Sequence, residues 1–191
     1  LKVEADYTWV AFFNDVSGRT GVPSRYLGRL KNGEIKAKGL ELCRRDAPLF
    51  IKKTMEEGLS IVSQSESKEE LREALEKVLE LVKKREIELY LGLVGESELV
   101  VDKRISKPIE KYNKRIAHVI AAKELGLGVK NIRYVESQIP YPVDFGSMGY
   151  SADRYASWLE RAAKPFRDML DGLSFGPRQN LLYSGKDSLT F

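Results

Sequence analysis

Two clusters of cationic side chains carry most of the chemistry that this sequence offers. Residues 19–45 contain eight lysines and arginines against two glutamates, and residues 103–118 contain six against one. Residues 66–98, which lie between them, contain ten glutamates against six cations. Two basic segments separated by an acidic one are typical of a protein that turns one side toward a polyanion and another toward solvent. A solvated basic face is the alternative for either cluster, and charge alone leaves both open.

Groups that would form a catalytic centre are missing from the pattern. Phosphoryl transfer at a two-metal site needs paired carboxylates, but the nine aspartates are scattered and none stands in an Asp-x-Asp pair. The sequence has no glycine-rich phosphate loop, and Cys43 with His118 cannot make a zinc site. We therefore predict no catalytic residue, no metal site and no cofactor in this chain.

The first cationic cluster lies on a predicted β-hairpin. Asn32-Gly33 joins two alternating runs, and both residues tolerate the positive φ of a two-residue type I′ turn. Such a turn sets Arg29 opposite Lys36. Because strand side chains alternate, one face is expected to carry the apolar set, which favours a core role for its tyrosine: Tyr26, Gly28, Leu30, Ile35, Ala37 and Gly39. The other face is expected to carry Arg29, Lys31, Lys36 and Lys38.

The segments around the hairpin predict one strand before it and a helix after it. Residues 1–13 alternate loosely, as a strand does. At Asp46 the period changes, because this residue type caps helices, Pro48 fits a first turn, and apolar residues then recur at helical spacing.

A mainly helical region follows. Ser67 and Glu70 have the spacing of a capping box, which predicts the start of a second helix. The expected fold is therefore α+β, with a small antiparallel sheet that is incomplete in this chain and a mainly α-helical domain after it. Its further elements are a short strand or extended segment over 99–101, a strand over 131–135, and helices over 117–125 and 151–170, the last kinked at Pro165.

Length and composition are those of a folded globular protein. Of 191 residues, 42% are hydrophobic and 31% are charged, and no apolar run reaches the roughly 18 residues that span a membrane. The single cysteine excludes an internal disulfide and favours a reducing, cytoplasmic setting. Leu1 begins as if in mid-strand, without an initiator methionine or a signal-peptide pattern. We therefore expect a fragment or a trimmed subunit.

Two segments of the hairpin region resemble family B DNA polymerases. Lys38–Asp46 is similar, nearly residue for residue, to the Arg-Gly-Leu-Glu-(apolar)2-Arg-Arg-Asp segment of that family. Ser24–Tyr26 is similar to its Lys-Lys-Arg-Tyr segment, with Pro23 and Ser24 in place of two lysines. The resemblance covers roughly residues 1–183 and continues at Leu99–Ile105, Tyr112, Ala117–Val119, Ala121–Lys123 and Pro165, with Ala117 where the family usually has proline.

The resemblance implies an architecture and a role. Residues 1–45 correspond to the C-terminal part of the palm, residues 46–183 to the thumb, and residues 184–191 to a tail. In the family the hairpin is the floor on which the primer–template duplex lies, and the catalytic aspartates with their Mg²⁺ stand N-terminal to the matched region. This chain alone is therefore expected to be inactive. Its expected partners are duplex primer–template DNA, a large polymerase subunit or the N-terminal remainder of the same polymerase, and a sliding clamp, in an intracellular, nucleoid-associated setting.

Candidate binding residues follow from the charge pattern and the resemblance together. If the strand continues, Arg44 and Arg45 point to opposite faces, so an ion pair with Asp46 is an alternative to a phosphate contact for either. The DNA-binding candidates are Arg25, Tyr26, Arg29, Lys36, Lys38, Gly39, Arg44, Arg45, Lys107, Lys114, Arg115 and His118. The tail resembles the start of a clamp-binding Gln-x-x-Leu-x-x-aromatic box, with lysine replacing glutamine, through Lys186, Leu189 and Phe191. An unstructured tail is the alternative there.

Three functions fit these observations. The first is the palm-edge and thumb portion of a family B DNA polymerase, excised or encoded as the small subunit of a split archaeal-type enzyme. The second is a non-catalytic scaffold subunit derived from an inactivated polymerase. The third is a free-standing basic module that binds RNA or DNA without a polymerase partner.

Overall fold

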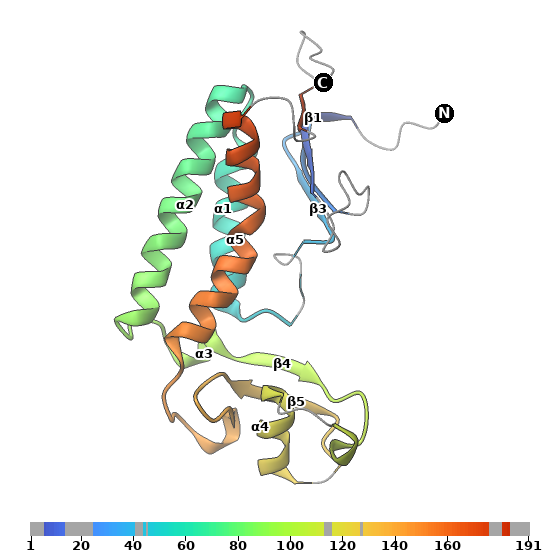
Figure 1. Cartoon of the computed structure of the whole chain (residues 1–191), viewed down its shortest axis with the longest axis vertical. Coiled ribbons are helices and arrows are strands. Elements are labelled where there is room, and N and C mark those ends of the chain that lie inside the picture. The colour runs from blue at the N-terminus through green and yellow to red at the C-terminus, as the bar shows by residue number, and fades with distance from the viewer. Residues whose placement is uncertain are drawn as a thin grey trace. The chain divides into compact units, whose positions relative to one another are not determined.

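The structure, a computed structural model, confirms the α+β class. It describes residues 6–13, 25–40, 44, 46–112, 116–126, 128–175 and 181–183. The strands are β1 (Tyr7–Phe12), β2 (Tyr26–Leu30), β3 (Ile35–Lys38), β4 (Val101–Arg104), β5 (Asn131–Val135), β6 (Tyr141–Pro142) and β7 (Leu181–Tyr183). The α-helices of the described residues are α1 (Leu49–Ser63), α2 (Lys68–Tyr90), α3 (Glu96–Leu99), α4 (Ala117–Leu125) and α5 (Ala152–Phe175), and the short 3₁₀ helices among them are η2 (Ile109–Lys111) and η3 (Val143–Phe145) (Figure 1).

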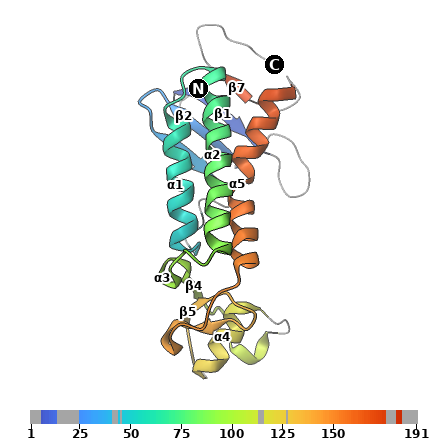
Figure 2. The same cartoon turned by 90° about the vertical axis from the view of Figure 1, so that its left-hand side faces the viewer.

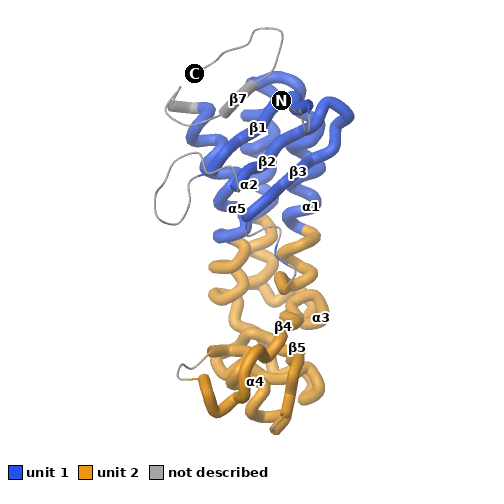
Figure 3. The backbone as a smooth tube through the Cα atoms, turned by 90° about the vertical axis from the view of Figure 1, so that its right-hand side faces the viewer, with its two compact units in different colours: residues 1–44, 54–83, 160–191 blue, residues 45–53, 84–159 orange. Residues whose placement is uncertain are grey.

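The chain packs into two compact units. Unit 1 comprises residues 1–44, 54–83 and 160–191, and unit 2 comprises residues 45–53 and 84–159 (Figure 3). Helices α1, α2 and α5 each contribute residues to both units. None of the described helices is both long enough and apolar enough to cross a membrane.

Unit 1 is an antiparallel sheet covered on one face by helices. The strand order is β3-β2-β1-β7, and α1, α2 and α5 lie on one side of this sheet (Figures 1 and 2). The sheet face toward the helices carries Trp9, Ala11 and Leu27, all at most 3% exposed. Burial of these apolar side chains is the main stabilising contribution between the two layers. The helices supply the other half of this core with Val62, Leu71, Leu75, Val78, Phe166 and Met169.

The hairpin turn has three residues, not two. The N–H of Gly33 donates to the carbonyl of Leu30 at 2.9 Å, and the N–H of Leu30 donates to the carbonyl of Glu34 at 2.8 Å. Of the three turn residues only Gly33 has a positive φ, of 88°, and the Asn32 side chain accepts from the N–H of Glu34. This is a type I turn closed by a left-handed glycine. The predicted type I′ turn is wrong because Asn32 uses its side chain, rather than a left-handed backbone, to complete the turn.

The extra turn residue shifts the predicted register by one. Arg29 stands opposite Ile35, and Gly28 stands opposite Lys36. Residues paired across antiparallel strands share a face, and a one-residue slip moves a whole strand to the other face. The predicted division into an apolar and a cationic face is therefore wrong. Lys36 and Lys38 share a face with Tyr26 and Gly28, whereas Arg29 shares the opposite face with Leu27, Ile35 and Ala37.

A β-bulge in β1 separates two aromatic residues that the alternation placed together. Tyr7 pairs with Leu30 and Trp9 pairs with Arg29, so Thr8 is the extra residue. A bulge resets the alternation. Trp9 consequently points to the helices, while Tyr7 lies on the other face of the sheet.

The helix-start signals agree with the structure in one case and differ in another. The Ser67 hydroxyl accepts from the N–H of Glu70 at 3.1 Å, which confirms the Ser67 cap. The Glu70 carboxylate accepts from the N–H of Glu66 at 2.7 Å, one residue before the N–H that a capping box would use. Helix α1, however, begins at Leu49, and the Asp46 carboxylate is paired with Lys103 in unit 2. Asp46 therefore links the start of α1 to β4 through a charged pair.

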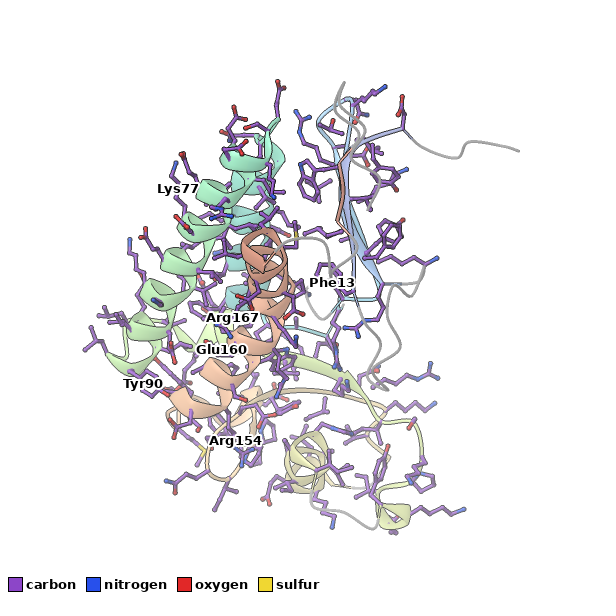
Figure 4. All side chains as sticks on the ribbon, turned by 45° about the horizontal axis from the view of Figure 1, so that its top comes forward. Phe13, Lys77, Tyr90, Arg154, Glu160 and Arg167 are labelled. Atoms are coloured by element: carbon purple, nitrogen blue, oxygen red, sulfur yellow. The ribbon has the colours of Figure 1, made fainter. Side chains whose placement is uncertain are left out.

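Pro165 lies inside α5, which runs unbroken from Ala152 to Phe175. Proline cannot donate to the carbonyl one turn earlier. A bidentate ion pair spans this position, with the two Nη atoms of Arg167 donating to the two carboxylate oxygens of Glu160 at 2.8 and 3.1 Å (Figure 4). The hydrogen bond from Arg167 lowers the pKa of Glu160. The pair ties two turns of α5 together across the missing bond.

Unit 2 is organised around a buried tyrosine. Its sheet has the order β4-β5-β6. The hydroxyl of Tyr155, which is 0% exposed, donates to the carbonyl of Leu99 at 2.7 Å and accepts from the N–H of Glu136 at 2.8 Å. Burial raises the pKa of Tyr155 far above its usual range, so the hydroxyl stays protonated. It thereby joins the end of α3, the end of β5 and α5.

Candidate nucleic-acid interface

The sheet face away from the helices in unit 1 gathers aromatic rings and lysines. We name it the outer sheet face. Tyr7 and Tyr26 meet edge to face with ring centroids 6.4 Å apart, and Phe12 lies 6.2 Å from Tyr26. The register places the side chains of β1, β2 and β3 on this face as follows: Tyr7, Val10, Phe12, Tyr26, Gly28, Leu30, Lys36 and Lys38.

Gly28 is what allows the Tyr7 ring to lie against this face. A Cβ atom at position 28 would stand 2.8 and 2.9 Å from two carbons of the Tyr7 ring. Such distances are closer than ordinary van der Waals contact, so a side chain here would displace the ring. The sequence suggested no such role for Gly28, because the pairing of β1 with β2 was needed to bring Tyr7 over it.

Lys36 and Lys38 are the cations of the outer sheet face. Lys36 is partly exposed and Lys38 is exposed. Within the part of the chain that the structure describes, no carboxylate pairs with either lysine, whereas Lys31 at the turn forms an ion pair with Asp6 at 2.7 Å. The register places no carboxylate among the β1, β2 and β3 side chains of this face. Glu34, opposite Leu30 at the turn, is the carboxylate at its edge. The face is therefore suited to an anionic ligand.

Arg29 does not lie with Lys36 and Lys38 on the outer sheet face. Its guanidinium donates to the carbonyl of Ser63, to the Thr8 hydroxyl at 3.0 Å and to the Glu66 carboxylate at 3.5 Å. Its side chain is only 12% exposed. Arg29 thus fastens the sheet to the turn between α1 and α2, and its charge does not join that of Lys36 and Lys38.

The open end of the hairpin holds two further predicted residues. The Arg25 side chain donates to the carbonyl of Gly39 at 3.2 Å, and Gly39 has a positive φ of 66°. This bond closes the end of the β2–β3 ladder. Arg44, a few residues on, is exposed.

A second candidate surface lies in unit 2. We name residues 104–112 the basic loop, because Arg104, Lys107 and Lys111 in it are all exposed. The Lys107 ammonium lies 4.6 Å from the centre of the Tyr112 ring, a cation–π distance. The Tyr112 hydroxyl accepts from the N–H of Ser106 at 3.2 Å. These contacts hold the loop compact around Tyr112.

His118 packs on this loop. Its ring lies edge to face with Tyr112 at 6.0 Å. Burial lowers the pKa of His118 from its ordinary value of 6.5, and the charge of Lys103 lowers it further. At neutral pH His118 can therefore offer a hydrogen bond to a phosphate, but not a positive charge.

Unit 2 should lose stability as the pH falls below about 6.5. The folded state disfavours protonated His118, so between its lowered pKa and the unfolded value the unfolded chain binds more protons. Thermal unfolding between about pH 7.5 and 5.5 should show a decline that is smaller in His118→Gln, whose amide does not titrate. An NMR midpoint for His118 above 6.5, or equal declines in both proteins, would contradict this assignment.

Several predicted residues lie outside the part that the structure describes. These are Arg45, Lys114, Arg115, Lys186, Leu189 and Phe191. Among the described residues, no group of three or more histidine, cysteine, aspartate or glutamate side chains could hold a metal ion. The sequence also missed Tyr7 and Phe12, whose positions depend on a bulge and on strand pairing that no local signal encodes.

Comparisons with known proteins agree on one family. The model of DNA polymerase family B matches residues 24–145. The chain is 33% identical over 133 residues to a DNA polymerase of Archaeoglobus fulgidus, covering 68% of this chain and 16% of that protein. It is 29% identical over 126 residues to DNA polymerase 1 of Saccharolobus solfataricus, covering 65% of this chain and 14% of that protein.

A solved structure has the same fold. The family B DNA polymerase from the hyperthermophilic archaeon Pyrobaculum calidifontis superposes with a TM-score of 0.61 at 23% identity, over 88% of this chain and 22% of that one. The chain therefore spans less than a quarter of the length of each of these relatives.

Proposed function

Because the chain belongs to DNA polymerase family B, we propose that it is the part of such an enzyme that grips duplex primer–template DNA. In this proposal residues 1–45 are the C-terminal part of the palm and residues 46–183 are the thumb. The observation that carries it is the reach of the family match, which includes both the hairpin and the basic loop. The contacts go to phosphates, so binding is independent of base sequence.

The contact residues in this proposal follow the charges of the two surfaces. Lys36 and Lys38 supply the charge of the outer sheet face, and Lys107 supplies charge in the basic loop. Arg29 is left out because its guanidinium is engaged on the opposite face of the sheet. The remaining candidates are Arg25, Tyr26, Gly39, Arg44, Arg45, Lys114, Arg115 and, as a neutral donor, His118.

Catalysis belongs to other residues in this proposal. The described part of this chain offers no cluster of carboxylates that fits a two-metal site, so we assign it no chemical step. The aspartates and Mg²⁺ would be supplied by a large subunit of a split enzyme or by a longer polypeptide, on the nucleoid. We further propose that residues 184–191 engage a sliding clamp through Lys186, Leu189 and Phe191.

Primer extension by mixed components tests the proposal. A fluorescein-labelled primer with a recessed 3′ end on its template should bind the chain alone, as followed by fluorescence anisotropy. Extension should require both this chain and a family B polymerase chain that carries the aspartate motifs.

Each alternative has its own outcome in these assays. Duplex binding without any rescue of extension would favour a non-catalytic scaffold subunit derived from an inactive polymerase. Equal binding of duplex RNA and duplex DNA, with no effect on extension, would favour a free-standing nucleic-acid module. No duplex binding at all would refute the proposal.

A further inference from the structure

Two of the aromatic rings of the outer sheet face, Tyr7 and Phe12, have no role in the proposed grip on duplex DNA. A duplex presents phosphates outward and keeps its bases stacked inside, so a phosphate contact needs Lys36 and Lys38 but no ring. Yet three rings, Tyr7, Phe12 and Tyr26, lie partly exposed on this face beside the lysines. Unpaired bases are the part of a nucleic acid that stacks on such rings.

The architecture around the rings fits that ligand. A four-stranded antiparallel sheet is backed by helices on one face (Figure 3). Its other face carries aromatic and cationic side chains. Sheets of this kind bind single strands by stacking bases on aromatic side chains while cations follow the phosphates. We propose that the outer sheet face binds single-stranded nucleic acid, stacking unpaired bases on the Tyr7, Phe12 and Tyr26 cluster with phosphates held by Lys36 and Lys38.

The three rings pack against one another on this face. Their centroids are 6.4 and 6.2 Å apart, the usual separation of aromatic rings in edge-to-face or tilted contact. Because the rings are not stacked on one another, a ring face that its neighbours leave open can receive an unpaired base.

The Tyr7 ring can join the aromatic cluster because residue 28 is a glycine and has no side chain. The Tyr7 ring occupies the space that a Cβ at this position would need. Glycine here costs strand stability relative to a residue that packs. The space that this glycine leaves is filled by the Tyr7 ring on the outer sheet face, and not by a side chain of the core under the helices.

The inference rests on the proposed function in assigning Lys36 and Lys38 to phosphates, but it adds a different form of ligand. The test compares oligothymidylate of about 10 nucleotides, which forms no duplex and lies within the usual size of a single-strand site, with a blunt duplex. Binding of each is measured by fluorescence anisotropy with the full chain. Tyr7→Leu with Phe12→Leu removes two rings but keeps apolar bulk.

The expected result is a loss confined to the single strand. The double variant should bind oligothymidylate roughly tenfold or more weakly and the duplex within about twofold of the parent. Tyr7→Phe with Phe12→Tyr, which keeps both rings, should bind like the parent. A matched control, Tyr90→Leu with Phe145→Leu, removes two rings that are 55% and 49% exposed in unit 2 and should change neither affinity.

Other outcomes overturn the inference. Unchanged oligothymidylate binding in Tyr7→Leu with Phe12→Leu would refute it, as would an equal loss for both ligands. A parent chain that binds no duplex but does bind oligothymidylate would refute the proposed function and leave this inference standing. Should the variant fail to fold, photo-crosslinking of 5-iodouracil-substituted oligothymidylate to the parent decides: crosslinks at Tyr7, Phe12 or Tyr26 support it, and crosslinks only elsewhere contradict it.

Discussion

Replacing Lys36 and Lys38 together by glutamate should weaken duplex binding by about one to two orders of magnitude at low salt, equally for all sequences. The two lysines lie on one face of β2–β3, opposite Gly28 and Tyr26. Each phosphate contact releases counterions, so losing two should reduce the slope of log affinity against log salt by about 2. Fluorescence anisotropy across a salt series measures both quantities.

The matched control is Lys68→Glu with Lys77→Glu. It makes the same change in net charge, but on exposed positions of α2 in the acidic part of the chain (Figure 4 shows Lys77). Its affinity should fall only slightly, through long-range charge that salt screens. A salt slope that is unchanged in Lys36→Glu with Lys38→Glu, or equally changed in the control, would refute duplex binding at the outer sheet face.

Replacing Tyr155 by phenylalanine should destabilise unit 2 by about 2–4 kcal/mol, because a buried and a partly buried backbone group lose their partner at once. The Leu99 carbonyl and the Glu136 N–H both bond the Tyr155 hydroxyl, at 2.7 and 2.8 Å. The aromatic ring itself stays, so no large cavity adds to the loss. Urea unfolding gives the free energy, and amide hydrogen exchange at Glu136 should quicken in proportion.

Tyr150→Phe is the control for this change. The Tyr150 hydroxyl donates to the carbonyl of Leu89 at 2.8 Å and also has a backbone hydrogen bond with Val94, but in a partly buried position where water can take its place. Its loss should cost about 1 kcal/mol. If the two variants were equally stable, the double role of the Tyr155 hydroxyl in unit 2 would be wrong.

Elements set by local signals could be predicted closely from the sequence. The helix over 117–125 and the strand over 131–135 coincide with α4 and β5. The Ser67 cap also agrees with the structure. Each depends on periodicity or on bonds between residues three or four apart, which the sequence displays directly.

Features that depend on counting residues across a turn or a bulge could not be predicted. The same Asn32-Gly33 pair serves turns of two and of three residues, and the choice decides whether Arg29 or Tyr26 lies beside Lys36 and Lys38. The extra residue at Thr8 likewise decides where Tyr7 lies. The sequence thus located the hairpin but assigned its two faces wrongly, because a single residue exchanges them.

Each unit is built from separate stretches of the sequence, and this limits which fragments of the protein could fold by themselves. A polypeptide that ended at residue 44 would keep β1, β2 and β3 but none of the helices that shield Trp9 and Leu27 from water. Its sheet would expose a large apolar surface, which invites aggregation. Proteolytic nicking at one site could not release either unit intact, since each is assembled from separated stretches of the sequence.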